Sequence, residues 1–149
     1  MNIRYETDVA AWATEQASFL RAGRLDQLDL AHIAEEIEDV GKSEQRELAR
    51  NMAGLVMHLI RWQYQPSKRS ASWSLALTAQ RRVSARRLEK APSLAPLLVD
   101  PEWIDDVWVD AKALAEKEAG IDRAALPEVC PWRLADVLTP HWLPVSRTG

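Results

Sequence analysis

The sequence has few of the residues that interrupt helices and no pattern that indicates strands. Its 149 residues include only 5 glycines and 8 prolines, which fall between long segments where apolar residues recur every three or four positions. No run of Val and Ile alternates with polar residues as a half-buried strand requires. The sequence therefore predicts an all-α fold, a single-domain bundle of about five main helices with a short C-terminal helix, over residues 1–149.

Other absences limit the compartment and the partners. The single cysteine, Cys130, cannot form an internal disulfide, and the first residues lack the apolar core of a secretory signal. The longest nearly apolar run, residues 52–60, is far shorter than the roughly 20 residues that span a bilayer. We therefore expect a cytoplasmic protein with no membrane partner. The formal net charge of -3 indicates no particular class of partner.

Residues that cap helices divide the chain into six segments. Asp, Ser or Thr stands where each main apolar stripe begins, and its side chain can accept the first free backbone N–H groups. Glycine or proline follows where the stripes end. We expect residues 145–149 to form a disordered tail. The predicted helices cover residues 8–22, 30–40, 44–65, 70–90, 101–119 and 131–138, with a turn at 93–99 and caps at Thr7, Asp29, Ser43, Ser70 and Asp100.

The apolar stripes predict which faces are buried. The helix over 44–65 carries the widest apolar surface, so we expect it to be the most buried. The other helices should each bury one stripe at three- and four-residue spacing. The stripes of the first, second and fourth helices contain Val9, Trp12, Gln16 and Leu20; Leu30, Ile33, Ile37 and Val40; and Trp73, Leu77, Gln80, Val83 and Leu88.

Charge is segregated along the chain. Residues 61–90 carry eight basic side chains and one acidic side chain, whereas the segments on either side are acidic. This basic run could bind nucleic acid phosphates. The sequence favours a different interpretation, in which Arg82 and Arg86 face carboxylates of this chain or of a dimer mate, because phosphate-binding domains usually have a basic net charge. Nucleic acid is therefore an unlikely partner.

Polar side chains accompany two of the predicted apolar stripes. Glu36 and Glu38 lie at the two borders of the stripe in residues 30–40, where a carboxylate usually meets a partner. Asn51 and His58 share one side of the next helix with Gly54, and together they could form the wall of a groove. We expect His58 to be partly buried beside Glu36 or Glu38. The alternative is purely structural: Asn51 and His58 form hydrogen bonds with each other or with a backbone carbonyl between helices.

Seven tryptophans are an unusually high number for a chain of 149 residues. Most fall on or beside inward stripes, so core packing explains them. The corner between Trp62 and Trp73 also contains Arg69, and a cation–π contact or an anion site could form there. Cys130 could cap the last helix, where the helix dipole would favour a thiolate, but a buried inert cysteine is the simpler interpretation.

Five segments of the chain resemble one bacterial family. They are EEIEDVGKSEQRELARNM, HLIRWQYQPSKRSASW, QRR at 80–82, PSL at 92–94 and PEVCPW at 127–132. In this order they are similar to the family of domain of unknown function twenty-nine, short all-helical proteins abundant in cyanobacteria and some proteobacteria. The resemblance implies the helical fold and a bacterial origin. The family has no assigned activity, so no catalytic residue is carried over.

Three functions remain open at this point. The leading one is a non-catalytic interaction or small-ligand-binding module, with an unknown protein partner or a homodimer. Its candidate ligand-binding residues are Glu36, Glu38, Asn51, His58, Trp62, Arg69 and Trp73. The second is a small metal-dependent or acid-base enzyme using Glu36, Glu38 and His58, and the third is nucleic-acid binding through residues 70–90. No Glu-x-x-His motif occurs, which disfavours a di-iron bundle. For the leading function we expect no metal and no cofactor.

Overall fold

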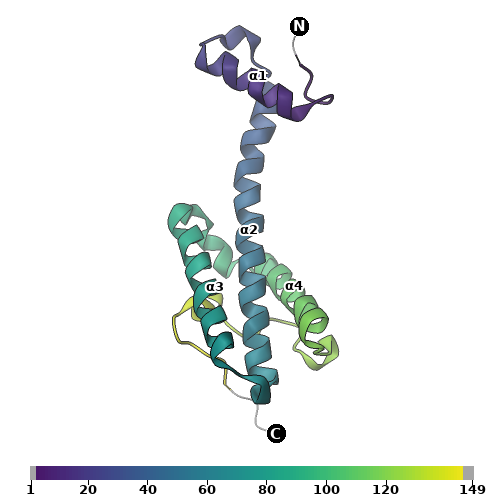
Figure 1. Ribbon diagram of the computed structural model, residues 1–149, viewed down its shortest axis with the longest axis vertical. Helices are drawn as coiled ribbons and strands as arrows, with labels where there is room; N and C mark the ends of the chain where they lie inside the picture. Colours follow the sequence, from purple (N-terminus) through teal and green to yellow (C-terminus); the bar gives the residue numbers. More distant parts are fainter. Residues whose placement is uncertain (1–2, 146–149) are drawn as a thin grey trace. The chain divides into compact units, whose positions relative to one another are not determined.

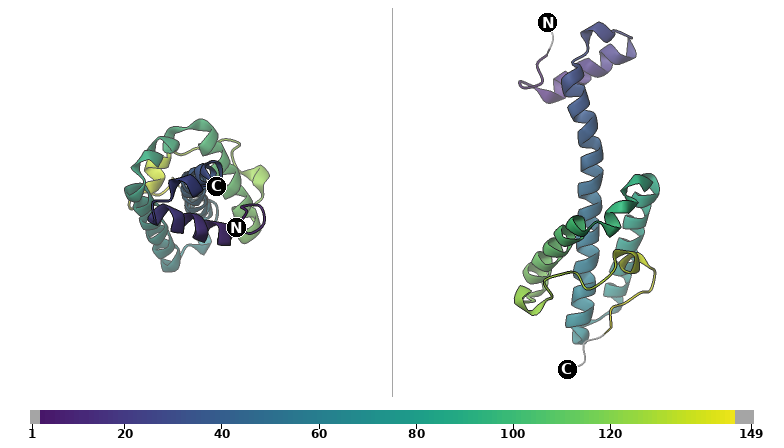
Figure 2. Two further views of the ribbon diagram at one scale, coloured as in Figure 1. Left: turned by 90° about the horizontal axis from the view of Figure 1, so that it is seen from above. Right: turned by 180° about the vertical axis from the view of Figure 1, so that it is seen from behind.

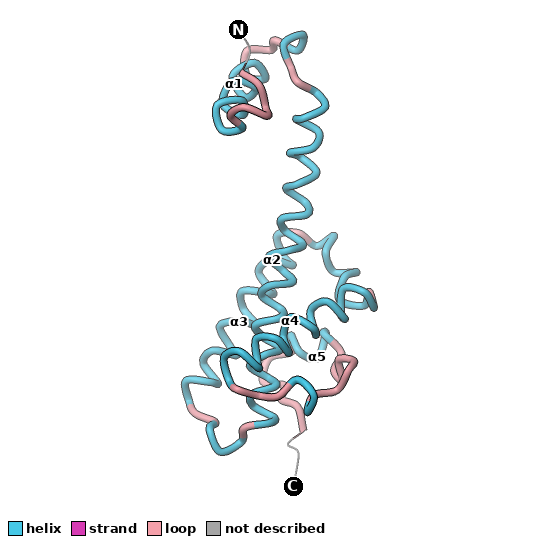
Figure 3. Tube along the Cα trace, turned by 90° about the vertical axis from the view of Figure 1, so that its right-hand side faces the viewer, coloured by secondary structure: helices cyan, strands magenta, loops and turns pink. Residues whose placement is uncertain are grey.

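A computed structural model describes residues 3–145, and every regular element within them is helical (Figures 1 and 3). This confirms the all-α prediction. The helices are α1 (Val9–Arg21), α2 (Leu30–Tyr64), α3 (Ala71–Lys90), α4 (Pro101–Ala119) and α5 (Leu134–Leu138), with 3₁₀ helices η1 (Leu25–Gln27), η2 (Pro66–Lys68), η3 (Pro92–Val99) and η4 (Arg123–Ala125). Among the described residues, no helix combines the length and the hydropathy that a membrane span requires.

The chain divides into two compact units, residues 1–43 and residues 44–149, which we call the N-terminal unit and the C-terminal unit. Helix α2 contributes its first residues to one unit and the remainder to the other. The single domain expected from the sequence stays a prediction. The disordered tail expected at 145–149 falls, from residue 146 onward, outside the described residues.

The N-terminal unit is a short helical hairpin. Helix α1 begins after Asp8, whose carboxylate accepts a hydrogen bond from the backbone of Ala11 at 3.0 Å. Asp8 therefore caps this helix in place of the predicted Thr7. Gly23 has φ +72°, a left-handed conformation that glycine adopts without steric cost. The chain can therefore leave α1 sharply and return through η1 to the start of α2.

The predicted break between residues 40 and 44 is wrong, because α2 runs through it without interruption. Gly41 and Ser43 lie inside the helix, although both residues are more frequent at helix ends. One interior glycine costs only about 1 kcal/mol relative to alanine, and the surrounding Glu, Lys, Gln and Arg residues favour helix. Propensity summed over the segment therefore outweighs the single glycine.

The apolar stripe expected to be buried in the N-terminal unit is instead exposed. Leu30 is 69% exposed, Ile37 67% and Val40 66%, and on α1 Val9 and Leu20 are also exposed. Only Trp12 and Gln16 are buried among the described residues of this unit. The prediction rested on a turn after residue 40 that would fold this helix back as a separate element of a bundle, and α2 makes no such turn.

The C-terminal unit contains the hydrophobic core. In Figures 1 and 2, α3 and α4 lie on either side of the C-terminal part of α2. Residues 52–60 of α2 are therefore buried on nearly all sides, as expected for the widest apolar surface. The core side chains from α2 include Leu48, Met52, Leu55, Val56, Leu59 and Ile60, and those from the other elements include Leu77, Leu94, Val107, Trp108, Leu134 and Val137.

The buried stripe of α3 differs from the prediction by one position. Leu77, Arg81 and Ser84 are buried, whereas Val83 is 49% exposed. The guanidinium of Arg81 donates hydrogen bonds to two backbone carbonyls of the C-terminal segment, and the sequence pattern does not reveal these acceptors. A long polar side chain with such acceptors can therefore occupy a core position that an apolar residue was expected to fill.

Most helix ends follow the predicted capping pattern. Ser70 and Asp100 cap α3 and α4, and Gly120 ends α4 with φ +67°. Two other expectations were wrong. The turn predicted at 93–99 forms part of η3, and the last helix starts at Leu134, so Cys130 does not cap it.

Candidate functional site

The seam between α2 and α3 consists of polar and aromatic pairs repeated every seven residues. Arg87 lies 3.2 Å from Glu44 and 3.8 Å from Glu47. One heptad along, the side chain of Gln80 covers Gly54, where an added Cβ atom would lie 3.4 Å from the amide nitrogen. One further heptad along, the guanidinium of Arg61 stacks over a tryptophan of α3. This register shows that the two helices are antiparallel.

A groove of about 360 Å³ lies at the middle of this seam, lined by Arg50, Asn51, Gly54, Gln80 and Val83. Asn51 and Gly54 thus line a groove, as expected from the sequence, but His58 is not among the residues that line it. The amide nitrogen of Asn51 and the amide oxygen of Gln80 are buried and have no hydrogen-bond partner among the described residues. Among residues 3–145, no hydrogen bond joins Asn51 to His58.

His58 is partly buried, as predicted, but not beside Glu36 or Glu38. Burial is the largest influence on its pKa and lowers it, Arg61 lowers it further, and Glu118 of α4 opposes both. Glu36 accepts a hydrogen bond from Tyr5 in the N-terminal unit, and Glu38 is exposed. A contact of His58 with these carboxylates required a turn at residue 41, which α2 does not make.

The tryptophan corner contains cation–π contacts, one of the two possibilities that the sequence left open. The guanidinium of Arg69 lies 4.8 Å from the ring of Trp62, and its Nε donates to the carbonyl of Trp62 at 2.8 Å. The guanidinium of Arg61 lies 4.6 Å from the ring of Trp73. These contacts order the turn between α2 and α3. One face of each of these two rings is therefore covered by an arginine of the same chain.

Two further sequence hypotheses concern Cys130 and metal binding. The thiol of Cys130 donates to the carbonyl of Trp132 at 3.4 Å, and burial raises its pKa, which disfavours the reactive thiolate. Among residues 3–145, no group of three His, Cys, Asp or Glu side chains is arranged to hold a metal ion.

A second cluster of titratable side chains lies in the N-terminal unit. Asp29 follows η1 and occupies the predicted cap position of α2, where its carboxylate accepts from the backbone N–H of His32. The other carboxylate oxygen lies 2.7 Å from His32 Nδ1 and also accepts from the Trp12 indole at 3.0 Å. Nε2 of His32 lies 3.4 Å from Glu6. The imidazole is thus held between two carboxylates.

Tyr5 covers this cluster. Its ring stacks on the imidazole of His32 with centroids 4.1 Å apart, and it meets the ring of Trp12 edge-on. Its hydroxyl donates to Glu36 at 2.6 Å, and this hydrogen bond raises the pKa of Tyr5 to about 12. The hydrogen bond between His32 and Asp29 raises the pKa of His32 and lowers that of Asp29. Charged His32 is therefore favoured in the folded unit.

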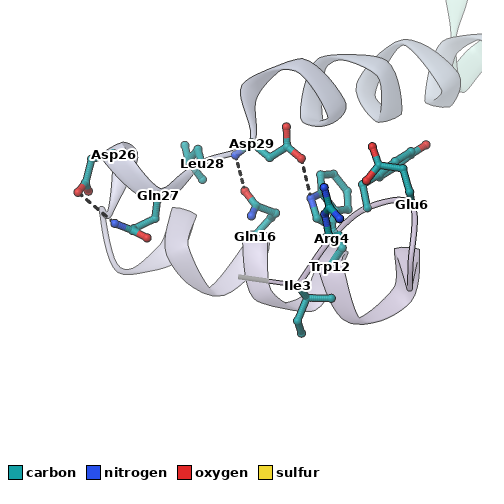
Figure 4. A pocket seen from close by; sticks show the side chains of 10 residues that line it. Ile3, Arg4, Glu6, Trp12, Gln16, Asp26, Gln27, Leu28 and Asp29 are labelled. Atoms are coloured by element: carbon teal, nitrogen blue, oxygen red, sulfur yellow. Dashed lines mark hydrogen bonds between the residues drawn. The ribbon is translucent and has the colours of Figure 1, made fainter. Parts of the chain in front are cut away.

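Figure 4 shows the pocket beside this cluster, with a volume of about 340 Å³. Trp12 and Gln16 of α1 face Asp29, whose backbone N–H donates to the Gln16 side chain at 2.8 Å. The pocket is therefore closed on one side by hydrogen bonds that also fix the start of α2. From the sequence, Asp29 was predicted only to cap the helix that begins at residue 30. The spacing of Asp29 and His32, three residues apart at a helix start, was the available signal.

The basic run of residues 61–90 is divided among different environments. Arg81 is buried, Arg87 pairs with Glu44 and Glu47, and Arg82 and Arg86 are exposed. Among the described residues, no carboxylate forms an ion pair with Arg82 or Arg86. The prediction that they face carboxylates of the same chain is therefore wrong, because Arg87 is the residue that faces α2. Their pairing with a dimer mate stays a prediction.

The geometry defines an all-helical protein with a hydrogen-bonded cluster around Asp29 and His32 and a polar groove between α2 and α3. The chain belongs to the DUF29 family, a domain of unknown function that matches residues 4–143. The match covers all five helices from α1 to α5 and confirms the family resemblance noted in the sequence. No curated protein and no solved structure matches the chain.

Proposed function

We propose that this protein is a non-catalytic interaction module that joins a second copy of itself through the N-terminal unit. The contact surface is an apolar stripe on α2, formed by Leu30, Ile33, Ile37 and Val40 and called the α2 stripe below. The observation that carries the proposal is the exposure of three of these side chains, which is 66–69% for Leu30, Ile37 and Val40, whereas Ile33 is half-buried. Exposed apolar side chains on one helix face are typical of interaction surfaces.

The spacing of the α2 stripe supports a helical partner. Its four members follow one another at intervals of three, four and three residues, the pattern of the contact positions in a coiled coil. Ala34 and Gly41 lie beside the stripe and are both exposed. Their small size would allow another helix to approach closely. The stripe thus has the shape of one half of a helix–helix interface.

A second copy is the partner that best explains the small core of this unit. The unit spans residues 1–43, close to the length of about 40 residues below which a chain usually needs a disulfide, a metal or oligomerisation, so it is marginal by itself. Only Trp12 and Gln16 are buried among its described residues. Symmetric self-association is the commonest way in which soluble proteins complete such a surface.

Sedimentation equilibrium of the full chain tests this proposal. The wild type should be a dimer at micromolar concentration, and Ile37→Asp should be a monomer, because a buried unpaired carboxylate would oppose association. Val109→Asp is the matched control, since Val109 of α4 is 52% exposed and lies outside the stripe. This control should remain a dimer. Circular dichroism should show the same helical content in all three proteins.

A monomeric wild type over the same concentration range would overturn the proposal. Equal loss of association in Ile37→Asp and Val109→Asp would also overturn it, because the stripe would then have no special role. A wild-type dimer that Ile37→Asp does not disturb would locate the interface elsewhere and would contradict the proposed surface. Salt-dependent retention on heparin, lost when Arg82 and Arg86 are neutralised, would favour nucleic-acid binding instead.

A further inference from the structure

A pocket of about 400 Å³ lies between α3 and the segment that follows α5. Its lining combines three cationic or titratable side chains with small and apolar ones. All of them belong to the C-terminal unit, so the pocket is independent of the α2 stripe. The lining residues are Thr78, Arg81, Arg82, Ala85, Leu138, Pro140 and His141.

Arg81 is the most unusual side chain in this pocket. It is only 7% exposed, and no carboxylate among the described residues forms an ion pair with it. Its Nε donates to the carbonyl of Val137 at 2.9 Å, and one terminal nitrogen donates to the carbonyl of Trp142. A guanidinium has five N–H groups, so these two acceptors leave donors for a ligand. Burial lowers the pKa of Arg81, as expected when no anion compensates the charge.

Arg82 brings a second positive charge to the same pocket. It is exposed and, within the described part of the chain, has no acidic partner. Two adjacent arginines on one helix normally point in directions about 100° apart. Here both contribute to one cavity because the segment after α5 folds over this part of α3. Two guanidinium groups without carboxylates would repel each other and attract an anion.

His141 completes the polar part of the lining. It has φ +68°, and it is the one non-glycine residue with a positive φ among residues 3–145. This left-handed conformation is uncommon for a residue with a side chain and carries a modest steric cost. The turn that holds it follows Pro140 and is closed by a hydrogen bond from the Trp142 backbone to Thr139 at 3.2 Å. The backbone is therefore in an uncommon conformation at His141, a residue that lines the pocket.

The remaining lining is apolar. Ala85, Leu138 and Pro140 present carbon atoms to the cavity. A predominantly apolar cavity with a few convergent polar groups is the usual design of a small-molecule site, and its volume lies within the usual range for such sites. An inorganic anion would contact the polar side chains and leave the apolar ones without contacts. An organic anion would contact both groups of side chains.

We propose that this pocket binds a small organic anion, whose carboxylate or phosphate group contacts Arg81, Arg82 and His141. The apolar body of the ligand packs against Leu138 and Pro140. Arginine is suited to this role, because its planar fork of N–H groups matches both carboxylate and phosphate oxygens. The ligand also supplies the negative charge that the buried Arg81 lacks.

The experiment is a titration of the ¹⁵N-labelled full chain, followed by amide chemical shifts at constant ionic strength. The probes are benzoate, phenyl phosphate, inorganic phosphate and the uncharged benzyl alcohol. Benzoate or phenyl phosphate should give saturable shifts at Ala85, Leu138 and His141, and the stronger of the two identifies the anionic group. Inorganic phosphate should bind more weakly, and benzyl alcohol should give no saturable shift.

Two variants separate the pocket from the general positive charge of α3. Arg82→Gln should weaken binding by about tenfold, the loss expected for a charge-assisted hydrogen bond. Arg86→Gln is the matched control, because Arg86 lies one turn away, is equally exposed and does not line the pocket. The Arg86→Gln variant should bind the organic anion with the affinity of the wild type. His141→Gly relieves the left-handed strain, so it should keep the fold and still weaken binding.

Equal effects of Arg82→Gln and Arg86→Gln would overturn the proposal, since the anion would then be attracted only by the charge of the helix. Benzyl alcohol binding as tightly as benzoate would also overturn it, because the pocket would then be merely apolar. Absence of saturable shifts with every anion would have the same consequence. The monomeric Ile37→Asp protein should bind as the wild type does, which keeps this test distinct from that of self-association.

Discussion

The two units of this chain are stabilised in different ways. The C-terminal unit buries aliphatic side chains from α2, α3, α4 and α5 in one cluster. The N-terminal unit buries only Trp12 and Gln16 among its described residues, and it is ordered by hydrogen bonds around Asp29. Hydrophobic burial contributes most of the free energy of folding. The comparison therefore indicates that the N-terminal unit is the less stable part of the chain.

The largest expected contrast between the units comes from removing an aliphatic side chain. Leu55 is fully buried, so Leu55→Ala should lower the free energy of unfolding of the C-terminal unit by about 2–5 kcal/mol. Leu30 is 69% exposed, so Leu30→Ala in a monomeric Ile37→Asp background should change stability by no more than about 0.5 kcal/mol. Urea denaturation followed by circular dichroism measures both. Similar losses would show that the exposed stripe is packed within the monomer.

The next contrast concerns the hydrogen bonds of the N-terminal unit. Trp12→Phe keeps an aromatic ring and removes the indole donor to Asp29, which should cost about 1–2 kcal/mol. The loss should appear as faster amide hydrogen exchange in α1 and at the start of α2, with unchanged exchange in α4. A uniform increase in the exchange rate over both units would mean that they unfold together, which would contradict the difference in stability between them.

The sequence predicted the helical class and most helix ends because both depend on local signals. Ser70, Asp100 and Gly120 act within one turn of their own positions, and periodicity identified the residues of α2 that form the core. The sequence could not predict what depends on contacts between distant segments. Arg81 is buried because carbonyls some sixty residues later accept its hydrogen bonds, and Val83 is exposed as a consequence.

The same distinction between local and long-range contacts explains which predicted site residues lie together and which do not. Asn51 and Gly54 share a groove because they lie on one face of one helix, whereas the pairing of His58 with Glu36 or Glu38 required a turn that does not exist. The cluster of Asp29, His32 and Trp12 was missed because its members come from two helices. Local spacing alone does not bring an indole of α1 to a carboxylate at the start of α2.

A smaller effect tests the continuity of α2 where the two units meet in sequence. An added Cβ atom at Gly41 would have no neighbour within 4 Å, so alanine fits without steric cost. In the monomeric Ile37→Asp background, Gly41→Ala should raise stability by about 0.5–1 kcal/mol, the usual gain inside a helix. Thermal denaturation monitored at 222 nm measures the change. A loss of stability would indicate that residue 41 needs the conformational freedom of glycine and that the sequence prediction of a break was right.

The smallest contrast concerns the pH dependence of the two units, because His32 and His58 have opposite pKa shifts. The hydrogen bond to Asp29 raises the pKa of His32, and Glu6 and Glu35 act in the same direction. Its stabilising contribution is therefore complete below pH of about 6.5 and is lost as the pH rises through the raised value. The lowered pKa of Asp29 adds stability that is lost only as the solution becomes strongly acidic.

His58 reverses this dependence in the C-terminal unit. Burial and Arg61 lower its pKa and Glu118 opposes them, so charged His58 is disfavoured in the folded state. Its contribution is complete above pH of about 6.5 and is lost as the pH falls toward the lowered value. As the pH rises from 5 to 8 at fixed protein concentration, amide exchange corrected for its intrinsic pH dependence should therefore show the segment of α2 around His58 gaining protection below pH of about 6.5 and α1 losing protection above it. His58→Gln should abolish the first trend and His32→Gln the second. Parallel trends in both units would contradict the assignment, because one titrating group would then control the whole chain.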